Sequence, residues 1–197
     1  MITEQVFRKM RENFGKVSSW AVWADVISTP KSGTGDLSVF ESRDLLKTLN
    51  PDYVFVGLNI SGGGNMDDAP DWGNFHSDYR THNDYKLRYA LKGTRFWGAY
   101  MTDIIKKHAD PDGGEVMRYL KDHPDVIKEN IESFRKEIAC LGTKPALIAM
   151  GGKPYGILSS SLGGEFKIMH ITHYSYTISK EDYRKRILEE LGFNEGV

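Results

Sequence analysis

The sequence predicts an α/β protein of three layers (α/β/α) around a four-stranded parallel central sheet. Four short apolar runs, each of strand length, are separated by segments of helix or loop character. Two of these runs lead into glycine, at Gly57 and at Gly151, where a strand gives way to a loop or a helix. Such an alternation is typical of a parallel sheet covered on both faces.

Residues 1–50 are expected to form a helical extension within a single domain of residues 1–197. Apolar side chains fall on one side of a short helix at residues 3–14. A second helix is expected from Val39 to Leu49, ending before Pro51, because proline disfavours helix in the residue that precedes it.

The four expected strands begin at about Tyr53, Tyr100, Ala146 and Phe166. Between the second and the third, apolar residues recur every three or four positions from Ile127 to Leu141, which predicts an amphipathic helix. Further helices are expected after Gly151 and after Ser179. In parallel sheets ligands bind beyond the carboxyl ends of the strands, so candidate functional residues are sought there.

Composition excludes several classes of protein. With 197 residues, 40% of them hydrophobic and 12% aromatic, the chain can bury a full core, unlike a disordered protein. No apolar stretch is long enough to span a membrane, and the charged N-terminal segment lacks a signal-peptide core. The single cysteine, Cys140, excludes an internal disulfide, a cysteine-based zinc site and an iron–sulfur cluster. We therefore expect a cytoplasmic protein, with no metal and no cofactor.

The overall charge of the chain does not identify a class of binding partner. Lys and Arg number 26 and Asp and Glu 27, so the formal net charge is −1. Dedicated nucleic-acid binders usually carry a basic balance, so any such role here rests on a local patch. A monomer or a weak oligomer is expected.

The first expected strand runs into a glycine-rich turn that contains Gly57, Asn59 and Ser61. Glycine lets the backbone approach a ligand closely, and Asn59 offers one acceptor and two donors at the strand end. A flexible turn capped by Asn59 explains the same residues equally well. No Gly-Lys-Ser/Thr follows, so the turn is not a nucleotide P-loop.

A long loop from about Ser61 to His82 carries Phe75 and His76 among other aromatic residues. Long ordered loops in compact domains tend to be functional. The aromatic side chains either plug the surface of the domain or stack on a planar ligand. The last expected strand ends in His173 and Ser175, a second candidate for a site at a strand end.

Four segments, taken in order, resemble motifs of the uracil-DNA glycosylase superfamily, and their pattern is most similar to the mismatch-specific uracil/thymine DNA glycosylases. They are Gly57-Leu58-Asn59, Thr94-Arg95-Phe96-Trp97, the stretch from Ala146 to Tyr155 and His173-Tyr174-Ser175. The resemblance spans roughly Tyr53 to Leu191. Ile60 and Tyr174 stand where the family has proline, Ser61 replaces a glycine, and Thr94 replaces an asparagine.

The resemblance implies the uracil-DNA glycosylase-like fold and a flipped base whose N-glycosidic bond is cleaved by water. Asn59 matches the residue that positions the water, and His173 the donor to the departing base. The substrate-binding residues it implies are Gly57, Ser61, Phe75, His76, Asp103 and Ser175, with Phe75 stacking on the base. The implied partner is DNA or a nucleotide.

Asp103 departs from related glycosylases, which carry asparagine to read the base. An ionised carboxylate only accepts hydrogen bonds, so it would repel O4 of uracil and suit a base edge that presents two donors. Alternatively, Asp103 caps a helix or pairs with Lys106 or Arg95.

Three functions follow from these residues. The leading hypothesis is a hydrolase acting on a nucleobase in damaged or mismatched DNA or in a nucleotide. The second is a catalytically inactive module of the same fold that recognises a base or nucleotide. The third is a structural protein whose polar strand ends form a subunit contact.

Overall fold

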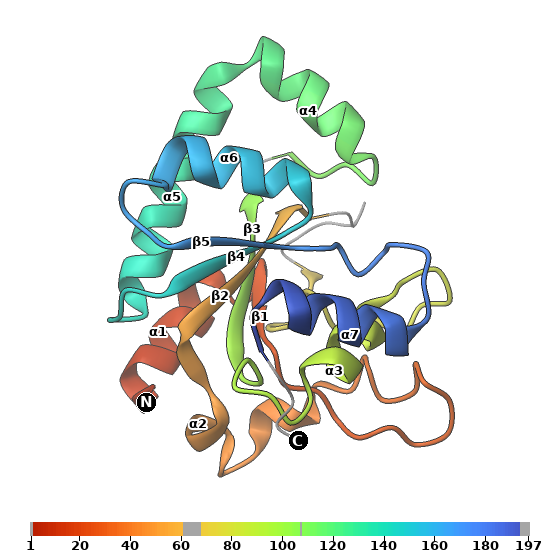
Figure 1. Cartoon of the computed structure of the whole chain (residues 1–197). Coiled ribbons are helices and arrows are strands. Elements are labelled where there is room, and N and C mark those ends of the chain that lie inside the picture. Colours follow the sequence, from red (N-terminus) through yellow and green to blue (C-terminus); the bar gives the residue numbers. More distant parts are fainter. Residues whose placement is uncertain (1, 61–67, 107, 194–197) are drawn as a thin grey trace.

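The computed structural model describes residues 2–60, 68–106 and 108–193 (Figure 1). In chain order, the elements are α1 (Glu4–Phe14), β1 (Ser18–Trp20), the 3-10 helix η1 (Leu37–Glu41), α2 (Leu45–Thr48), β2 (Asn50–Asn59), α3 (Asp84–Leu91), β3 (Ala99–Ile105), α4 (Gly113–Asp122), α5 (Pro124–Cys140), β4 (Ala146–Met150), α6 (Gly152–Leu162), β5 (Ile168–Ile171) and α7 (Lys180–Glu190).

The sheet has five strands in the order β1-β3-β2-β4-β5. The strands β3, β2, β4 and β5 pair in parallel, so their carboxyl ends share one edge of the sheet. The first strand, β1, pairs antiparallel with β3 and makes the sheet mixed. The predicted α/β class is therefore confirmed, and the sheet is one strand larger than the sequence predicted.

The N-terminal extension differs from the prediction in two places. It supplies β1 to the sheet as well as helices, because the free edge of β3 offers hydrogen bonds to a segment too short to show a periodic pattern. The helix expected from Val39 to Leu49 is two short pieces, η1 and α2, separated at Ser42, which has an extended backbone. The Ser42 hydroxyl accepts from the Asp44 N–H, and such local bonds compete with a continuous helix.

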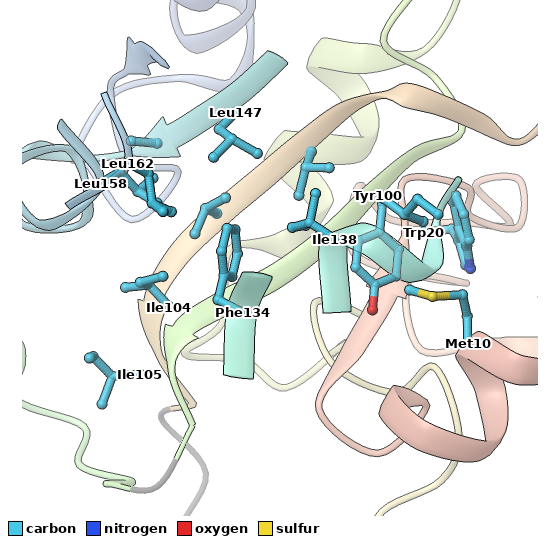
Figure 2. Close-up of a cluster of buried hydrophobic side chains, with 14 of the residues drawn as sticks. Met10, Trp20, Tyr100, Ile104, Ile105, Phe134, Ile138, Leu147, Leu158 and Leu162 are labelled. Carbon is cyan, nitrogen blue, oxygen red and sulfur yellow. The ribbon is translucent and has the colours of Figure 1, made fainter. Parts of the chain in front are cut away.

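The sheet separates two hydrophobic cores. Alternate side chains of β2 enter different cores: Val54 and Val56 pack into the first and Phe55 into the second. The first core includes residues of α1, α4, α5 and α6, and Figure 2 shows Tyr100 of β3, Phe134 of α5 and Leu147 of β4 within it. The second core includes residues of α3 and α7. Helices thus cover both faces of the sheet, and the carboxyl ends of the parallel strands line a pocket.

A buried polar network fixes the carboxyl end of β3. The Glu137 carboxylate of α5 accepts from the hydroxyls of Tyr100 at 2.9 Å and Thr102 at 2.8 Å. The Lys106 ammonium lies 2.6 Å from Oε2 of Glu137 and donates to the backbone oxygen of Asp103 at 2.6 Å. Because every partner is held by another, the strand end that carries Asp103 has one well-defined position.

Candidate functional site

A pocket of about 400 Å³ lies at the carboxyl ends of the parallel strands. Strand ends and the loops after them build its wall: Gly57–Asn59 of β2, Asp103 of β3, residues 150–154 from the end of β4 to the first turn of α6, and His173–Ser175 after β5. Asn74 and Phe75 of a connecting loop complete it. This is the edge of a parallel sheet where ligands ordinarily bind, and the volume suits a small molecule.

The structure brings most of the predicted site residues together. Six of them line this one pocket: Gly57, Asn59, Phe75, Asp103, His173 and Ser175. Ser61 lies outside the described residues. His76 is buried beside the pocket and lines a neighbouring cavity of about 610 Å³ instead.

The ring of His76 is held by the protein itself. Its Nε2 lies 2.7 Å from the Val22 carbonyl oxygen, and its Nδ1 lies 3.0 Å from the Asn74 carbonyl oxygen and 3.1 Å from the Ser19 hydroxyl. The ring also stacks on Trp23 at a centroid distance of 5.2 Å. These contacts make His76 a support for the aromatic loop.

The carboxylate of Asp103 is 3% exposed and belongs to the pocket wall. Its Oδ2 accepts from the Asn74 side-chain amide at 2.9 Å. Burial raises the pKa of Asp103 to about 6, against the lowering effect of the Asn74 bond and the Lys106 charge. Of the alternatives that the sequence left open, Lys106 does contact Asp103, but through the backbone oxygen.

Gly57 faces Asp103 across the parallel pair of β2 and β3. A Cβ at Gly57 would collide with Oδ1 of Asp103 and would lie 3.6 Å from Cε1 of Phe75. The missing side chain therefore makes room for the Asp103 carboxylate, with the Phe75 ring in ordinary contact beside it, whereas the sequence pattern indicated room for a ligand.

Asn59 ends β2 with its side-chain amide in a fixed orientation. Its Nδ2 donates to the Asp110 carbonyl oxygen at 2.7 Å, with the carbonyl oxygens of Ile60 and His108 at 3.2 and 3.4 Å. The side-chain N–H groups of Asn59 thus point toward backbone carbonyl oxygens of the protein. The side-chain oxygen Oδ1 is the group that can accept a hydrogen bond from a ligand or water.

The hydrogen bonds of His173 define its tautomer. The backbone N–H of Ser175 donates to Nδ1 at 3.1 Å, and the Ser175 hydroxyl lies 2.7 Å from the same nitrogen. A backbone N–H is always a donor, so Nδ1 is unprotonated and the neutral ring carries its proton on Nε2. Burial lowers the pKa of His173 to about 4, which keeps the ring neutral at pH 7.

Phe75 occupies a strained backbone conformation at the pocket. Its φ is 63°, as is that of Trp72, in the left-handed region that side chains other than glycine rarely adopt. The conformation is held by the Trp23 indole, which donates to the Phe75 carbonyl oxygen at 3.1 Å, and by Asn74 Oδ1, which accepts from the Phe75 N–H at 3.2 Å. Such strain costs about 1–3 kcal/mol and clusters at functional sites.

Three side chains at or beside the pocket are not among the site residues expected from the sequence. Asn74 lies within the aromatic loop that was singled out, but its contact with Asp103 has no sequence signal. Asp84, 5% exposed, accepts from the Ser77 N–H at 2.8 Å, and burial raises its pKa to about 6. Burial raises the pKa of the Tyr174 hydroxyl, and the neighbouring carboxylate of Asp84 raises it further.

The segment Thr94–Trp97 lies apart from the pocket. It precedes β3, at the end of that strand opposite to Asp103. The Arg95 carbonyl oxygen accepts from the Asn50 side chain at 2.8 Å, and its guanidinium lies 5.0 Å from the centre of the Phe96 ring. This part of the motif pattern joins the starts of two strands.

Comparisons with protein-family models and with curated proteins give no match for this chain. Within the described ranges, no three His, Cys, Asp or Glu side chains are grouped as a metal site would require. Across the same part of the chain, no helix combines the length and apolar character needed to cross a membrane.

Proposed function

We propose that this chain is a nucleobase-recognising hydrolase with the three-layer uracil-DNA glycosylase-like fold, which cleaves an N-glycosidic bond in damaged or mismatched DNA or in a nucleotide. One observation carries the proposal. Asn59, Phe75, Asp103 and His173 come from four separate parts of the chain and line the same pocket at the carboxyl ends of parallel strands.

Recognition of the base rests on Phe75 and Asp103. The Phe75 ring provides an aromatic surface for a planar base, and stacking of this kind contributes about 1–3 kcal/mol per base. The Asp103 carboxylate, ionised at pH 7 since its pKa is about 6, accepts a hydrogen bond from the edge of that base. The hydrogen bonds of the Phe75 backbone with Trp23 and Asn74 hold the strained loop, and with it the ring, in place before the ligand arrives.

Bond cleavage rests on Asn59 and His173. Oδ1 of Asn59 accepts a hydrogen bond from a water molecule and orients it toward the sugar carbon. Because an amide is a weak base, the bond to the departing base breaks largely before the water attacks. Negative charge then develops on a carbonyl oxygen of the base, and the Nε2–H of His173 donates a hydrogen bond to it. The water that adds to the sugar carbon loses its second proton to the departing base anion, so the products are the sugar hydroxyl and the neutral free base. Loss of a comparable donor costs about 100- to 1,000-fold in rate.

A second candidate is a catalytically inactive module that recognises a base or nucleotide. The observation that favours it is the carboxylate content of the pocket: among the described lining residues, Asp103 is the one carboxylate, and Asn74 already engages it. If the other oxygen of Asp103 reads the base, no second carboxylate among the described lining residues is left to take a proton from water.

A panel of labelled oligonucleotides separates the two candidates. Single-stranded and duplex forms would carry uracil, mispaired thymine, hypoxanthine or an undamaged base, and the same free bases and their nucleotides would be included. Released base and complex formation are measured on the same samples. Release of a base supports the hydrolase. Selective binding of one modified base without release supports the binding module, and neither binding nor release for any oligonucleotide or free base contradicts both.

A further inference from the structure

The side chain of Asn74 uses all of its hydrogen-bonding groups at the pocket. Its amide nitrogen donates to Oδ2 of Asp103 at 2.9 Å and to the Val17 carbonyl oxygen at 3.0 Å. Its oxygen accepts from the Phe75 N–H at 3.2 Å. A single amide thus ties together the end of β3, the segment before β1 and the backbone of Phe75.

This arrangement makes the two oxygens of Asp103 unequal. Oδ2 is turned to Asn74, whereas Oδ1 lies over Gly57. The Phe75 ring approaches the same point, since Cε1 lies 3.6 Å from the position of a Cβ on Gly57. Oδ1 and the edge of the Phe75 ring therefore lie at the same point of the pocket wall, over Gly57.

The hydrogen-bonding character of the pocket differs from side to side. On the side of β2 and β3, Oδ1 of Asp103 and Oδ1 of Asn59 are acceptors. On the side of β5, His173 carries a proton on Nε2 and is a donor. A ligand that matches both sides presents an N–H to Asp103 and a carbonyl oxygen to His173.

We propose that Asn74 is a positioning residue that holds Asp103 so that one oxygen, Oδ1, reads an N–H group of the base. The inference rests on the proposed function insofar as the ligand is a nucleobase. It narrows the substrate class to bases with an unsubstituted ring N–H or amino group at this edge. It also replaces the pair of acceptors expected from the sequence by a single acceptor.

Free bases and their N-methylated analogues test this directly. The dissociation constants of hypoxanthine and 1-methylhypoxanthine, and of uracil and 3-methyluracil, would be measured by calorimetry with the parent protein. A hydrogen bond to a charged group predicts that methylation weakens binding by about 10- to 100-fold in at least one pair. Equal binding of both members of each pair, or binding of none of the four, overturns the proposal.

Variants of Asn74 separate positioning from general support of the fold. Asn74→Asp keeps the shape of the side chain but loses the N–H bond to the Val17 carbonyl oxygen and places a second carboxyl group against Asp103, with which it must share a proton. Asn74→Leu removes every hydrogen bond. For both, the discrimination against the methylated base should fall to within about threefold. The matched control is Asn13→Asp, since Asn13 is exposed on α1 and its side chain donates to the Lys9 carbonyl oxygen. This control should discriminate like the parent.

The outcomes are distinct from those of the proposed function. If Asn74 variants bind both members of a pair more weakly by the same factor, Asn74 supports the fold alone and the inference fails, even when the parent releases bases from oligonucleotides. If discrimination is lost as expected but no base is ever released, the inference holds for a binding module. Thermal denaturation of each variant identifies one that fails to fold, and Asn74→Asp and Asn74→Leu are not expected to fail together.

Discussion

Gly57 and Asp103 are direct partners across β2 and β3, and the carboxylate of Asp103 fills the space that a side chain at Gly57 would need. The pair explains why a glycine follows the apolar part of β2. Its consequence is that the shape of the pocket at this point depends on both residues together.

Gly57→Ala is expected to destabilise the protein by about 1–3 kcal/mol, because overpacking forces the buried Asp103 side chain from its position. In an Asp103→Ala background the same change should cost less than half as much, since the colliding oxygen is gone. Denaturant unfolding measures both. Gly164→Ala is the matched control, because a Cβ there meets no atom within 4 Å. Equal costs of Gly57→Ala in both backgrounds would contradict the collision.

Asp103 should make stability depend on pH. Burial raises its pKa in the folded protein to about 6, above the ordinary value of 3.8. The folded state therefore binds the proton more tightly than the unfolded state does. The contribution of Asp103 to the free energy of unfolding falls as the pH rises from about 4 to 6. Asp103→Asn should gain stability relative to the parent over this range, by up to about 1.4 kcal/mol per pH unit, and keep the gain above pH 7. A difference that stays constant between pH 4.5 and 8 would argue against the raised pKa.

The same substitution should change the choice of base. Asparagine can donate to O4 of uracil, whereas the ionised carboxylate only accepts, so Asp103→Asn should bind or excise uracil better than the parent. Extrusion of a base costs a few kcal/mol and costs least in single strands and mispairs, so the gain should appear there first. Release of uracil from labelled oligonucleotides is the measurement. If the parent already releases uracil efficiently and Asp103→Asn releases it no faster, Asp103 is a structural residue and does not select the base.

His173 should act as a neutral donor over the whole physiological range. Because burial lowers its pKa to about 4, the single-turnover rate should show no step from this histidine between pH 5.5 and 8. A rate that changes tenfold near pH 6.5 in the parent, and no longer does so in His173→Gln, would show that the ring titrates normally. Asp103→Asn is measured in parallel, since the Asp103 carboxyl group does titrate in this interval.

Long periodic elements were predictable from the sequence, whereas short ones and side-chain contacts were not. Ala146–Met150 is β4 as expected, and the helix from Ile127 to Leu141 is the main part of α5, because a continuous apolar pattern specifies them locally. The three residues of β1 carry no such pattern and pair because β3 offers a free edge. The site residues at strand ends followed from the topology, but the bond between Asn74 and Asp103 depends on how a loop folds over the sheet.

The most direct test of the account is the single-turnover rate of base release for Asn59→Ala and His173→Ala, on whichever oligonucleotide the parent processes fastest. The account predicts that each variant loses about 100-fold or more in rate while it remains folded at the assay temperature, and that Asn13→Ala on α1 keeps the parent rate. Asn59→Ala should have the lower unfolding midpoint, because it loses the contacts with the carbonyl oxygens of Ile60, His108 and Asp110. If both variants release the base as fast as the parent, the pocket formed by Asn59, Phe75, Asp103 and His173 is not the catalytic site.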